Sequence, residues 1–419
     1  MKILLIYPPF ASTWGLPLGF GEPLGIAYVA AAIEASGRHQ VALLDGVGSR
    51  GPVSAFRTGQ VNWIGLSHEE VLAEIAKIDF DAIGVSACRT SAVDPGIERL
   101  IGRIRATHPG VPIIVGGPDA SHLWDHYAQN PDIDYVVIGE GEKTMIDLLD
   151  ALQRADGVTE VKGIAFRGED GTVIRAPDQD ILDIDTLPWP ARHLLPMLTY
   201  IRHRPTSDLP SATILTSRAC PFSCAFCSTI HIWGRKWRGR AAKDVVDEIE
   251  FLHRTYGVTE IRIQDDNFCV NRQRVHDICD LILERQLEIR LHIDPGVMFM
   301  LADQEMLSKL HRVGVRHLNM QLESGCQTTQ AYINKKIDLS HVRAMVTHAH
   351  SLGMTIHTNV ILGFPFETKA EMIDSVQTAV EIGFDNIDFN YLDPKGDTRV
   401  RRDFIAAGLL CPDDHIELP

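Results

Sequence analysis

Three cysteines, Cys220, Cys224 and Cys227, form the pattern Cys-x3-Cys-x2-Cys. The chain has eight cysteines and the other five are scattered, which is typical of a metal site in a reducing compartment rather than a disulfide framework. Three thiolates bind three irons of a 4Fe–4S cubane and leave the fourth iron open for a substrate ligand. A structural zinc site needs a fourth cysteine or histidine, and His231 is the near candidate. A catalytic iron–sulfur cluster is therefore the first prediction.

The cysteine motif directly follows an apolar run at residues 212–215, and strand and helix patterns alternate from there to residue 389. About six such βα units are typical of a partial (β/α)6 barrel of the TIM type. The predicted strands are 212–215, 260–264, 290–293, 317–321, 355–362 and 386–389, and the predicted helices are 243–255, 274–284, 304–313, 341–351 and 369–382.

The first part of the chain also alternates short apolar runs with helical periods, which predicts a doubly wound parallel sheet, a Rossmann-like α/β fold. Its predicted strands are 2–7, 41–44, 82–86, 112–115 and 135–138, and its helices are 24–35, 68–76 with Ser67 as N-cap, 96–106 and 145–152. Four loops, 8–21, 87–95, 116–121 and 139–142, follow these strands, where ligands bind in such sheets.

A hairpin is predicted at residues 162–176, and the proline-rich stretch 177–210 is interpreted as an interdomain linker lying on the surface. The expected domain organisation is 1–160 for the first α/β domain, 161–210 for the hairpin and linker, 211–400 for the barrel and 401–419 for a C-terminal tail.

The cysteine motif, placed on the first strand-to-loop connection of a βα series, closely resembles the radical S-adenosylmethionine (SAM) superfamily. Segments at 264–268, 323–325, 359–368 and 391–398 resemble further motifs of that superfamily in the same order. The alternative, purely structural interpretation of segment 264–268 is a helix cap. Besides the three cysteines, the resemblance implies that these residues contact the cosubstrate: Phe226, Asp265, Asp266, Glu323, Ser324, Asn359, Gly363 and Pro365.

The resemblance also implies an activity. The methionine amino and carboxylate groups of SAM chelate the open iron, and one electron cleaves the S–C5′ bond. The resulting 5′-deoxyadenosyl radical then removes a hydrogen atom from the substrate. The implied cofactors are a 4Fe–4S cluster and SAM.

The N-terminal half resembles the cobalamin-binding domains attached to this superfamily, through stretches within residues 23–37, 64–71, 115–122 and 137–144. The resemblance implies that Gly116, Gly117, Gly139 and Glu140 contact cobalamin. The Asp-x-His-x-x-Gly segment that gives a histidine to cobalt is absent, and His122 is not in that frame. The expected cobalamin therefore has no protein histidine on cobalt. The alternative is a domain that keeps the fold without using cobalamin.

Composition excludes several other classes. The net charge of −15 argues against a nucleic-acid partner. No apolar run is long enough to span a membrane, and the N-terminus lacks the features of a signal peptide, so a cytoplasmic location is expected. The basic segment 234–243 has two interpretations, a dock for an acidic electron donor such as flavodoxin or a reductase, or a solvated helix start.

Together these patterns predict a radical SAM enzyme of secondary metabolism that acts on a small molecule. One expected reaction is cobalamin-dependent C-methylation. The alternative is a cobalamin-independent dehydration or deoxygenation of a diol such as an aminoglycoside sugar, which the short stretch after the late Pro-x-Gly-Thr-like segment favours. A noncatalytic iron–sulfur or zinc protein is the rival from another class. Cys326 is either a buried thiol or a hydrogen donor in the barrel mouth.

Overall fold

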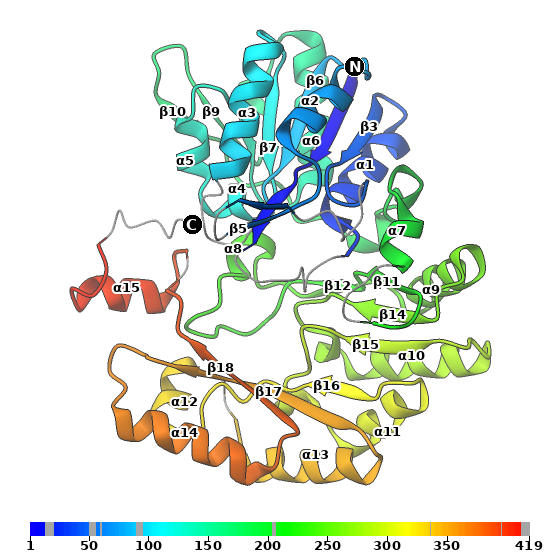
Figure 1. Cartoon of the computed structure of the whole chain (residues 1–419), viewed down its shortest axis with the longest axis vertical. Coiled ribbons are helices and arrows are strands. Elements are labelled where there is room, and N and C mark those ends of the chain that lie inside the picture. The colour runs from blue at the N-terminus through cyan, green and yellow to red at the C-terminus, as the bar shows by residue number, and fades with distance from the viewer. Residues whose placement is uncertain are drawn as a thin grey trace. The chain divides into compact units, whose positions relative to one another are not determined.

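The computed structural model describes residues 1–12, 21–49, 56–58, 61–88, 95–202, 207–335, 337–394 and 396–411. The chain divides into two compact units, Met1–Asp208 and a second unit that begins at Leu209 (Figure 1). Each unit is built on its own, mainly parallel sheet, and the two are described separately.

The first unit contains a seven-stranded sheet in the order β10-β9-β8-β7-β6-β1-β3. The strands from β3 to β8 are parallel, whereas β9 and β10 are antiparallel additions at one edge. The parallel strands follow the flavodoxin-like order 2-1-3-4-5, so β1 and β6 flank the topological switch point. The strands are β1 (Lys2–Tyr7), β3 (Gln40–Asp45), β6 (Ala82–Ser86), β7 (Ile113–Gly116), β8 (Tyr135–Val137), β9 (Ile164–Arg167) and β10 (Val173–Arg175).

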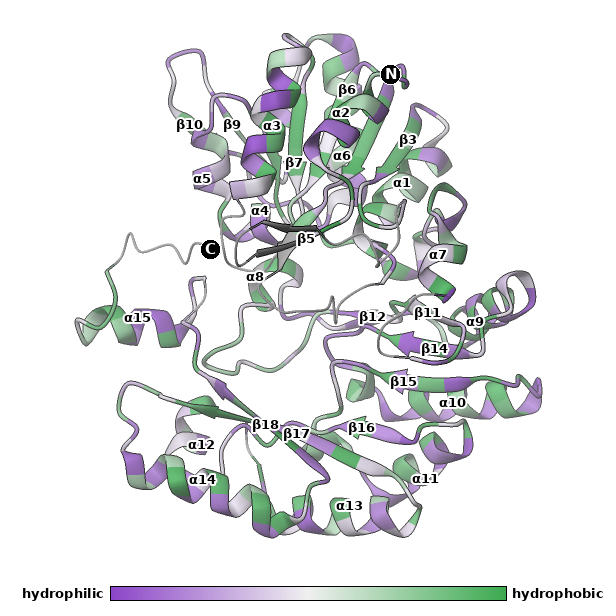
Figure 2. Ribbon diagram, viewed as in Figure 1, coloured by the Kyte–Doolittle hydropathy of each residue, from purple (hydrophilic) through white to green (hydrophobic). Residues whose placement is uncertain are grey.

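Helices cover both faces of this sheet, which explains why β1 is continuously apolar. Leu4 and Ile6 face a core shared with α2 and α3, whereas Ile3 and Leu5 face a second core shared with α1 and α6. Figure 2 shows the hydrophobic residues concentrated along the strands of this sheet. The helices are α1 (Leu24–Ser36), α2 (His68–Ile75), α3 (Pro95–Thr107), α4 (Pro118–His122), α5 (Trp124–Gln129) and α6 (Gly141–Arg154).

Most predicted elements of this unit are present. Ser67 caps α2 in a capping box with Glu70, as predicted. The predicted hairpin is β9–β10, and its pairing with β8 was not foreseen. A small sheet of β2 (Phe10–Ser12), β5 (Val61–Ile64) and β4 (Phe56–Thr58) was also missed.

The predicted surface linker is wrong in its second half. It contains α7 (Met197–Arg202), and Tyr200 of this helix is fully buried. The Tyr200 hydroxyl donates a hydrogen bond to Asp45 Oδ2 at 2.6 Å. The prolines in this stretch led to the prediction of a linker, although its apolar side chains form a helix that packs into the first unit.

The second unit has six parallel strands in chain order, β11-β14-β15-β16-β17-β18. This agrees with the predicted partial barrel, and helices follow the strands as expected. The strands are β11 (Ser211–Ile214), β14 (Glu260–Ile263), β15 (Arg290–Ile293), β16 (His317–Asn319), β17 (Thr355–Leu362) and β18 (Asn386–Tyr391); the helices are α9 (Ala242–Tyr256), α10 (Arg272–Glu284), α11 (Gln304–Arg312), α13 (Leu339–Ser351) and α14 (Lys369–Ile382).

Shorter elements shape the end of this sheet where the cysteines lie. Strands β12 (Ser217–Arg218) and β13 (Arg238–Gly239) precede and follow the cysteine loop in the sequence, and they pair as an antiparallel ribbon. Helices α8 (Ile230–Trp233), α12 (Gln327–Ile333) and α15 (Arg399–Ala406) were not predicted.

Candidate active site

The cysteine loop is held by backbone hydrogen bonds on both sides. Ala225 N donates to Ile333 O at the end of α12, and Val400 N of α15 donates to Ala225 O. Within the loop, Cys227 N donates to Cys224 O. These contacts bring residues far apart in sequence to the motif, and no spacing signal predicted them.

Asp265 fixes the chain just before the cysteines. Its carboxylate accepts hydrogen bonds from Thr216 N at 2.6 Å, from the Thr216 hydroxyl and from the Ser217 hydroxyl at 2.6 Å. The side chain is 0% exposed. The structure therefore shows Asp265 positioning Thr216 and Ser217, at the junction of β11 and β12. Its predicted contact with the cosubstrate stays a prediction.

The next two residues approach the cysteines themselves. Burial and the charge of the neighbouring Asp265 raise the pKa of Asp266 to about 7. A hydrogen bond from the Ala219 backbone acts in the opposite direction and lowers it. The Asn267 side-chain amide lies 3.7 Å from Cys220 Sγ and 3.1 Å from Met298 Sδ. Sequence reasoning passed over Asn267, although it stands within the predicted motif.

The three thiols lie in a half-buried environment. Burial raises the pKa of Cys224 to about 11; nearby Lys335 lowers it, and the charges of Cys227 and Cys220 raise it. A bound metal stabilises such thiolates, and cysteine thiolates are the ligands of 4Fe–4S clusters. The donor set therefore fits the predicted cluster.

Single-ion sites were also considered. Within the described ranges, no three His, Cys, Asp or Glu side chains are grouped so that they hold one metal ion. The side chain of His231, the candidate fourth zinc ligand, lies outside the described part of the chain.

Glu323 adopts a left-handed backbone conformation, with φ of 66°. Its backbone pairs with β17 through Asn359 O and Ile361 N, and its carboxylate lies 2.6 Å from Lys335 Nζ. Both partners of this ion pair are buried. The charges of Glu323 and Lys335 both act on Cys224, so this ion pair lies near the cysteine loop. The predicted cosubstrate contact of Glu323 stays a prediction, and Lys335 had no sequence signal.

The side chain of Ser324, next in the sequence, contacts α14 instead of Lys335. Its hydroxyl is fully buried and lies 2.8 Å from Ser375 Oγ of α14. Cys326 N donates to both hydroxyl oxygens, and Cys326 itself is buried. The Ser324 hydroxyl thus has a structural contact, its predicted cosubstrate contact stays a prediction, and Cys326 matches the interpretation of a buried thiol.

Asn359 belongs to a chain of amides across three strands. Its Nδ2 donates to Gln321 Oε1 at 2.7 Å, and Asn390 Nδ2 donates to Asn359 Oδ1 at 3.1 Å. Gln321 in turn donates to Asn319. Asn359 alternates with the buried residues of β17, so this face of the sheet is polar.

A second polar group lies on β14 and β15. Burial opposes the charged form of Asp294, but the hydrogen bond from His292 and the charge of Arg262 lower its pKa. Arg262 Nε donates to Asp294 at 3.0 Å, and the Gln264 amide also reaches this carboxylate. A barrel interior is commonly filled by branched apolar residues. Here β14 and β15 carry charged and amide side chains instead, which suit a polar ligand.

Gly363 and Pro365 lie in the turn after β17. Gly363 has φ of 94°, and its N–H donates to Glu367 Oε2 at 2.8 Å. Phe226 packs beside the apolar cluster of Ile333, Phe364 and Val400. These contacts hold the cysteine loop against the turn, and the predicted cosubstrate contacts of Phe226, Gly363 and Pro365 stay predictions.

The predicted cobalamin loops begin at the ends of β7 and β8. A Cβ on Gly117, whose φ is 108°, would lie 2.5 Å from Ala87 O. Gly139 N donates to the Ser121 hydroxyl, which donates to Gly117 O. A glycine is thus required at position 117 because the loop after β7 passes close to the backbone of Ala87, whether or not a ligand also contacts it.

The remaining predicted cobalamin residues lie nearby. Gly116 ends β7, and Glu140 precedes α6 without a side-chain cap bond. The other two predicted loops, 8–21 and 87–95, lie largely outside the described residues.

The basic segment 234–243 contains one buried arginine and several exposed basic side chains. Arg240 is buried and pairs with Glu248 and Asp244, and Lys243 pairs with Asp247 at 2.7 Å. Arg235, Lys236 and Lys243 are exposed, so both interpretations of the segment stay open.

Two protein families match this chain. The radical SAM superfamily matches residues 214–379, and the B12 binding domain matches residues 17–149. The first range contains all three cysteines of the motif. The second contains three of the four predicted cobalamin loops and the end of the loop 8–21. The superfamily segments at 264–268, 323–325 and 359–368 lie within the first range, and the segment at 391–398 lies beyond it.

Curated relatives match most of the chain. An uncharacterized methyltransferase of Pyrococcus horikoshii is 29% identical over 98% of this chain and 84% of its own length. The cytidylyl-2-hydroxyethylphosphonate methyltransferase of Streptomyces wedmorensis is 27% identical over 94% of this chain and 80% of its own.

Among solved structures, the radical SAM methyltransferase TsrM of Kitasatospora setae, with cobalamin and a 4Fe–4S cluster bound, has a TM-score of 0.76 at 18% identity. The match covers 97% of this chain and 74% of that one, and it shows a shared fold. In the described part of the chain, no helix has the length and apolar character needed to cross a bilayer.

Proposed function

Because this chain is a radical SAM enzyme with an N-terminal B12-binding domain, we propose that it methylates a carbon atom of a small molecule in natural-product biosynthesis. The observation that carries the proposal is the presence of both domains in one chain. Two of its curated relatives, matched over 84% and 80% of their own length, are named methyltransferases, whereas others are named magnesium-protoporphyrin IX monomethyl ester cyclases. When bound, the cluster, SAM and cobalamin together supply an electron, a 5′-deoxyadenosyl radical and a methyl group.

The chain's own residues hold and orient these groups. We propose that Cys220, Cys224 and Cys227 bind the cluster and that Asp266 and Glu323 face the cosubstrate. The half-buried Cys thiols and the buried Lys335–Glu323 pair beside Cys224 support this placement. Lys335 lowers the pKa of Cys224, so it favours the thiolate that a metal requires.

Asn359 extends this group of polar side chains along β17, and its amide is already oriented by Gln321 and Asn390. We propose that it contacts SAM or substrate. Gly363, Pro365 and Phe226 complete the proposed cosubstrate site on its apolar side.

Two further proposals concern the cell. A one-electron donor, such as flavodoxin or a reductase, reduces the cluster. The protein works in the cytoplasm, because a cluster held by cysteines requires a reducing compartment.

The test uses anaerobically reconstituted protein with dithionite, hydroxocobalamin and SAM that carries a deuterated methyl group, so SAM is the only source of methyl. Cytidylyl-2-hydroxyethylphosphonate, the compound in one relative's name, is a first substrate to try, followed by extracts of the producing organism. The expected result is 5′-deoxyadenosine together with a product that gains the labelled methyl group. A product without the label, formed equally well without cobalamin, would refute methylation and support dehydration. The Cys224→Ala variant is the control for cluster-dependent chemistry.

A further inference from the structure

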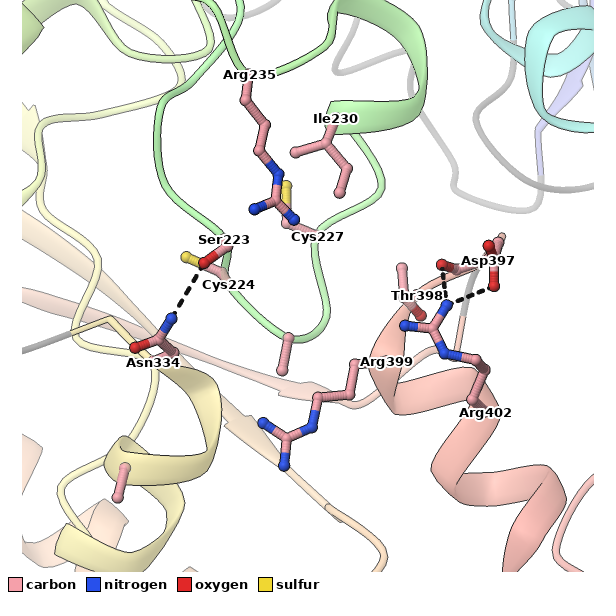
Figure 3. A pocket seen from close by; sticks show the side chains of 12 residues that line it. Ser223, Cys224, Cys227, Ile230, Arg235, Asn334, Asp397, Thr398, Arg399 and Arg402 are labelled. Atoms are coloured by element: carbon pink, nitrogen blue, oxygen red, sulfur yellow. Dashed lines mark hydrogen bonds and ion pairs between the residues drawn. The ribbon is translucent and has the colours of Figure 1, made fainter.

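A cavity of about 540 Å³ borders the cysteine loop within the second unit (Figure 3). Cys224 and Cys227 form part of its wall. Its volume lies in the range of small-molecule sites, about 300–1,000 Å³. The cavity therefore places a ligand-sized space directly beside the proposed cluster.

Three arginines from separate parts of the chain line this space. Arg235 follows α8, whereas Arg399 and Arg402 come from α15, and Figure 3 shows their side chains around the same cavity. The only carboxylate among the lining residues is Asp397, which already pairs with Arg402. Arg399 Nε also lies 3.7 Å from Asp403 Oδ2, a carboxylate of α15 outside the lining. The lining itself carries more positive than negative charge, in a chain whose net charge is −15.

Two of the guanidinium groups are held in place. Arg402 Nη1 donates to Asp397 O at 2.9 Å. The Arg399 guanidinium lies 4.4 Å from the ring centroid of Tyr332, a cation–π contact. Oriented guanidinium groups lose less entropy when they bind an oxyanion, and their fork geometry matches phosphate and carboxylate.

Neutral hydrogen-bonding groups complete the lining. Asn334 Nδ2 donates to the Ser223 hydroxyl at 3.1 Å, so both side chains already have a defined orientation at the cavity wall. The cationic and neutral donors together are typical of a site for a polyanionic oxo group.

We propose that this cavity binds a phosphate or phosphonate group of the substrate. This inference rests on the proposed function and adds the substrate's chemical class: a small molecule that carries a phosphoryl-type anion. The arginines bind the anion by charge-assisted hydrogen bonds and orient the substrate toward the cysteine loop.

The test measures binding of inorganic pyrophosphate to cluster-loaded protein by anaerobic calorimetry at constant ionic strength. Arg399→Gln and Arg402→Gln are each expected to weaken pyrophosphate binding about tenfold or more, because a hydrogen bond to a charged group contributes about 1.5–3 kcal/mol. Arg343→Gln is the matched control, since Arg343 lies on α13 and pairs with Glu381 outside the cavity. Its affinity for pyrophosphate should equal that of the unmodified protein.

The affinity for SAM is measured on the same variants and should stay within about twofold, since the proposal assigns the arginines to substrate. An equal loss of SAM affinity would overturn the proposal and assign the cavity to the cosubstrate carboxylate. Absence of pyrophosphate binding, or unchanged binding in both variants, would overturn it as well. Slower reduction by flavodoxin with unchanged pyrophosphate binding would assign the arginines to an electron donor instead. Because no turnover is measured, failure here is separate from failure of the methylation test.

Discussion

The Asn267 amide points at the sulfur of Cys220, and its removal should change the reduction potential of the cluster. The distance between Asn267 Nδ2 and Cys220 Sγ is 3.7 Å. Hydrogen bonds to cluster sulfurs are among the factors that set the potential. The reduced cluster carries more negative charge, so the hydrogen bond stabilises the reduced form more than the oxidised form. Asn267→Leu should therefore make the potential more negative.

The size of the shift follows from the strength of the contact. A hydrogen bond to a charged group contributes about 1.5–3 kcal/mol, and at this length the part that differs between oxidation states is about 0.5–1 kcal/mol. For one electron, about 59 mV corresponds to a tenfold change in the equilibrium constant, so the expected shift is about 20–40 mV.

The assay is a redox titration followed by electron paramagnetic resonance on protein with full iron content. Met298→Leu is the matched control, because Met298 Sδ is the other partner of the same amide and lies 3.1 Å from it. Trp237 binds the backbone carbonyl of Asn267, so this support survives the substitution. An unchanged or more positive potential in Asn267→Leu, with iron content intact, would refute the reasoning.

Three further predictions concern the cysteine loop and the first unit. Cys224→Ala should abolish 5′-deoxyadenosine formation and lower the iron content; retained cleavage of SAM would contradict the cluster assignment. Burial raises the pKa of Asp45, so its folded form favours the proton and stability falls as pH rises through that pKa. Tyr200→Phe should cost about 1.5–3 kcal/mol of unfolding free energy where Asp45 is ionised and less as pH falls, by urea titration; a pH-independent loss would contradict this. Gly117→Ala should lower the melting temperature of protein prepared without cobalamin, because the new Cβ meets Ala87 O; an unchanged melting temperature would leave ligand contact as the reason for the glycine.

Much of the fold was predictable because buried parallel strands are continuous apolar runs. The strand at Ala82–Ser86 and the helix at Lys369–Ile382 were predicted to the residue. The helix containing Tyr200 was not, because prolines on either side hide a short apolar helix whose burial depends on distant residues.

The candidate site shows the same division. Cys220, Cys224 and Cys227 are recognisable because a local spacing carries their chemistry. Lys335 and Arg399 are not, since only the folded chain brings them beside the cysteine loop. Asp265 and Ser324 were found by motif position, but their hydrogen bonds show that a motif residue can serve the scaffold.

The hydrogen bonds that Asp265 accepts near the cysteine loop bear on the stability of the protein after oxygen destroys the cluster. These bonds from Thr216 and Ser217, with the backbone bonds of Ala225 to Ile333 and Val400, attach the cysteine loop to the rest of the second unit at several points. Zinc fingers, by contrast, are unfolded until metal binds. Because these protein contacts share the entropy cost of ordering the loop with the metal, loss of the cluster to oxygen should leave the second unit folded.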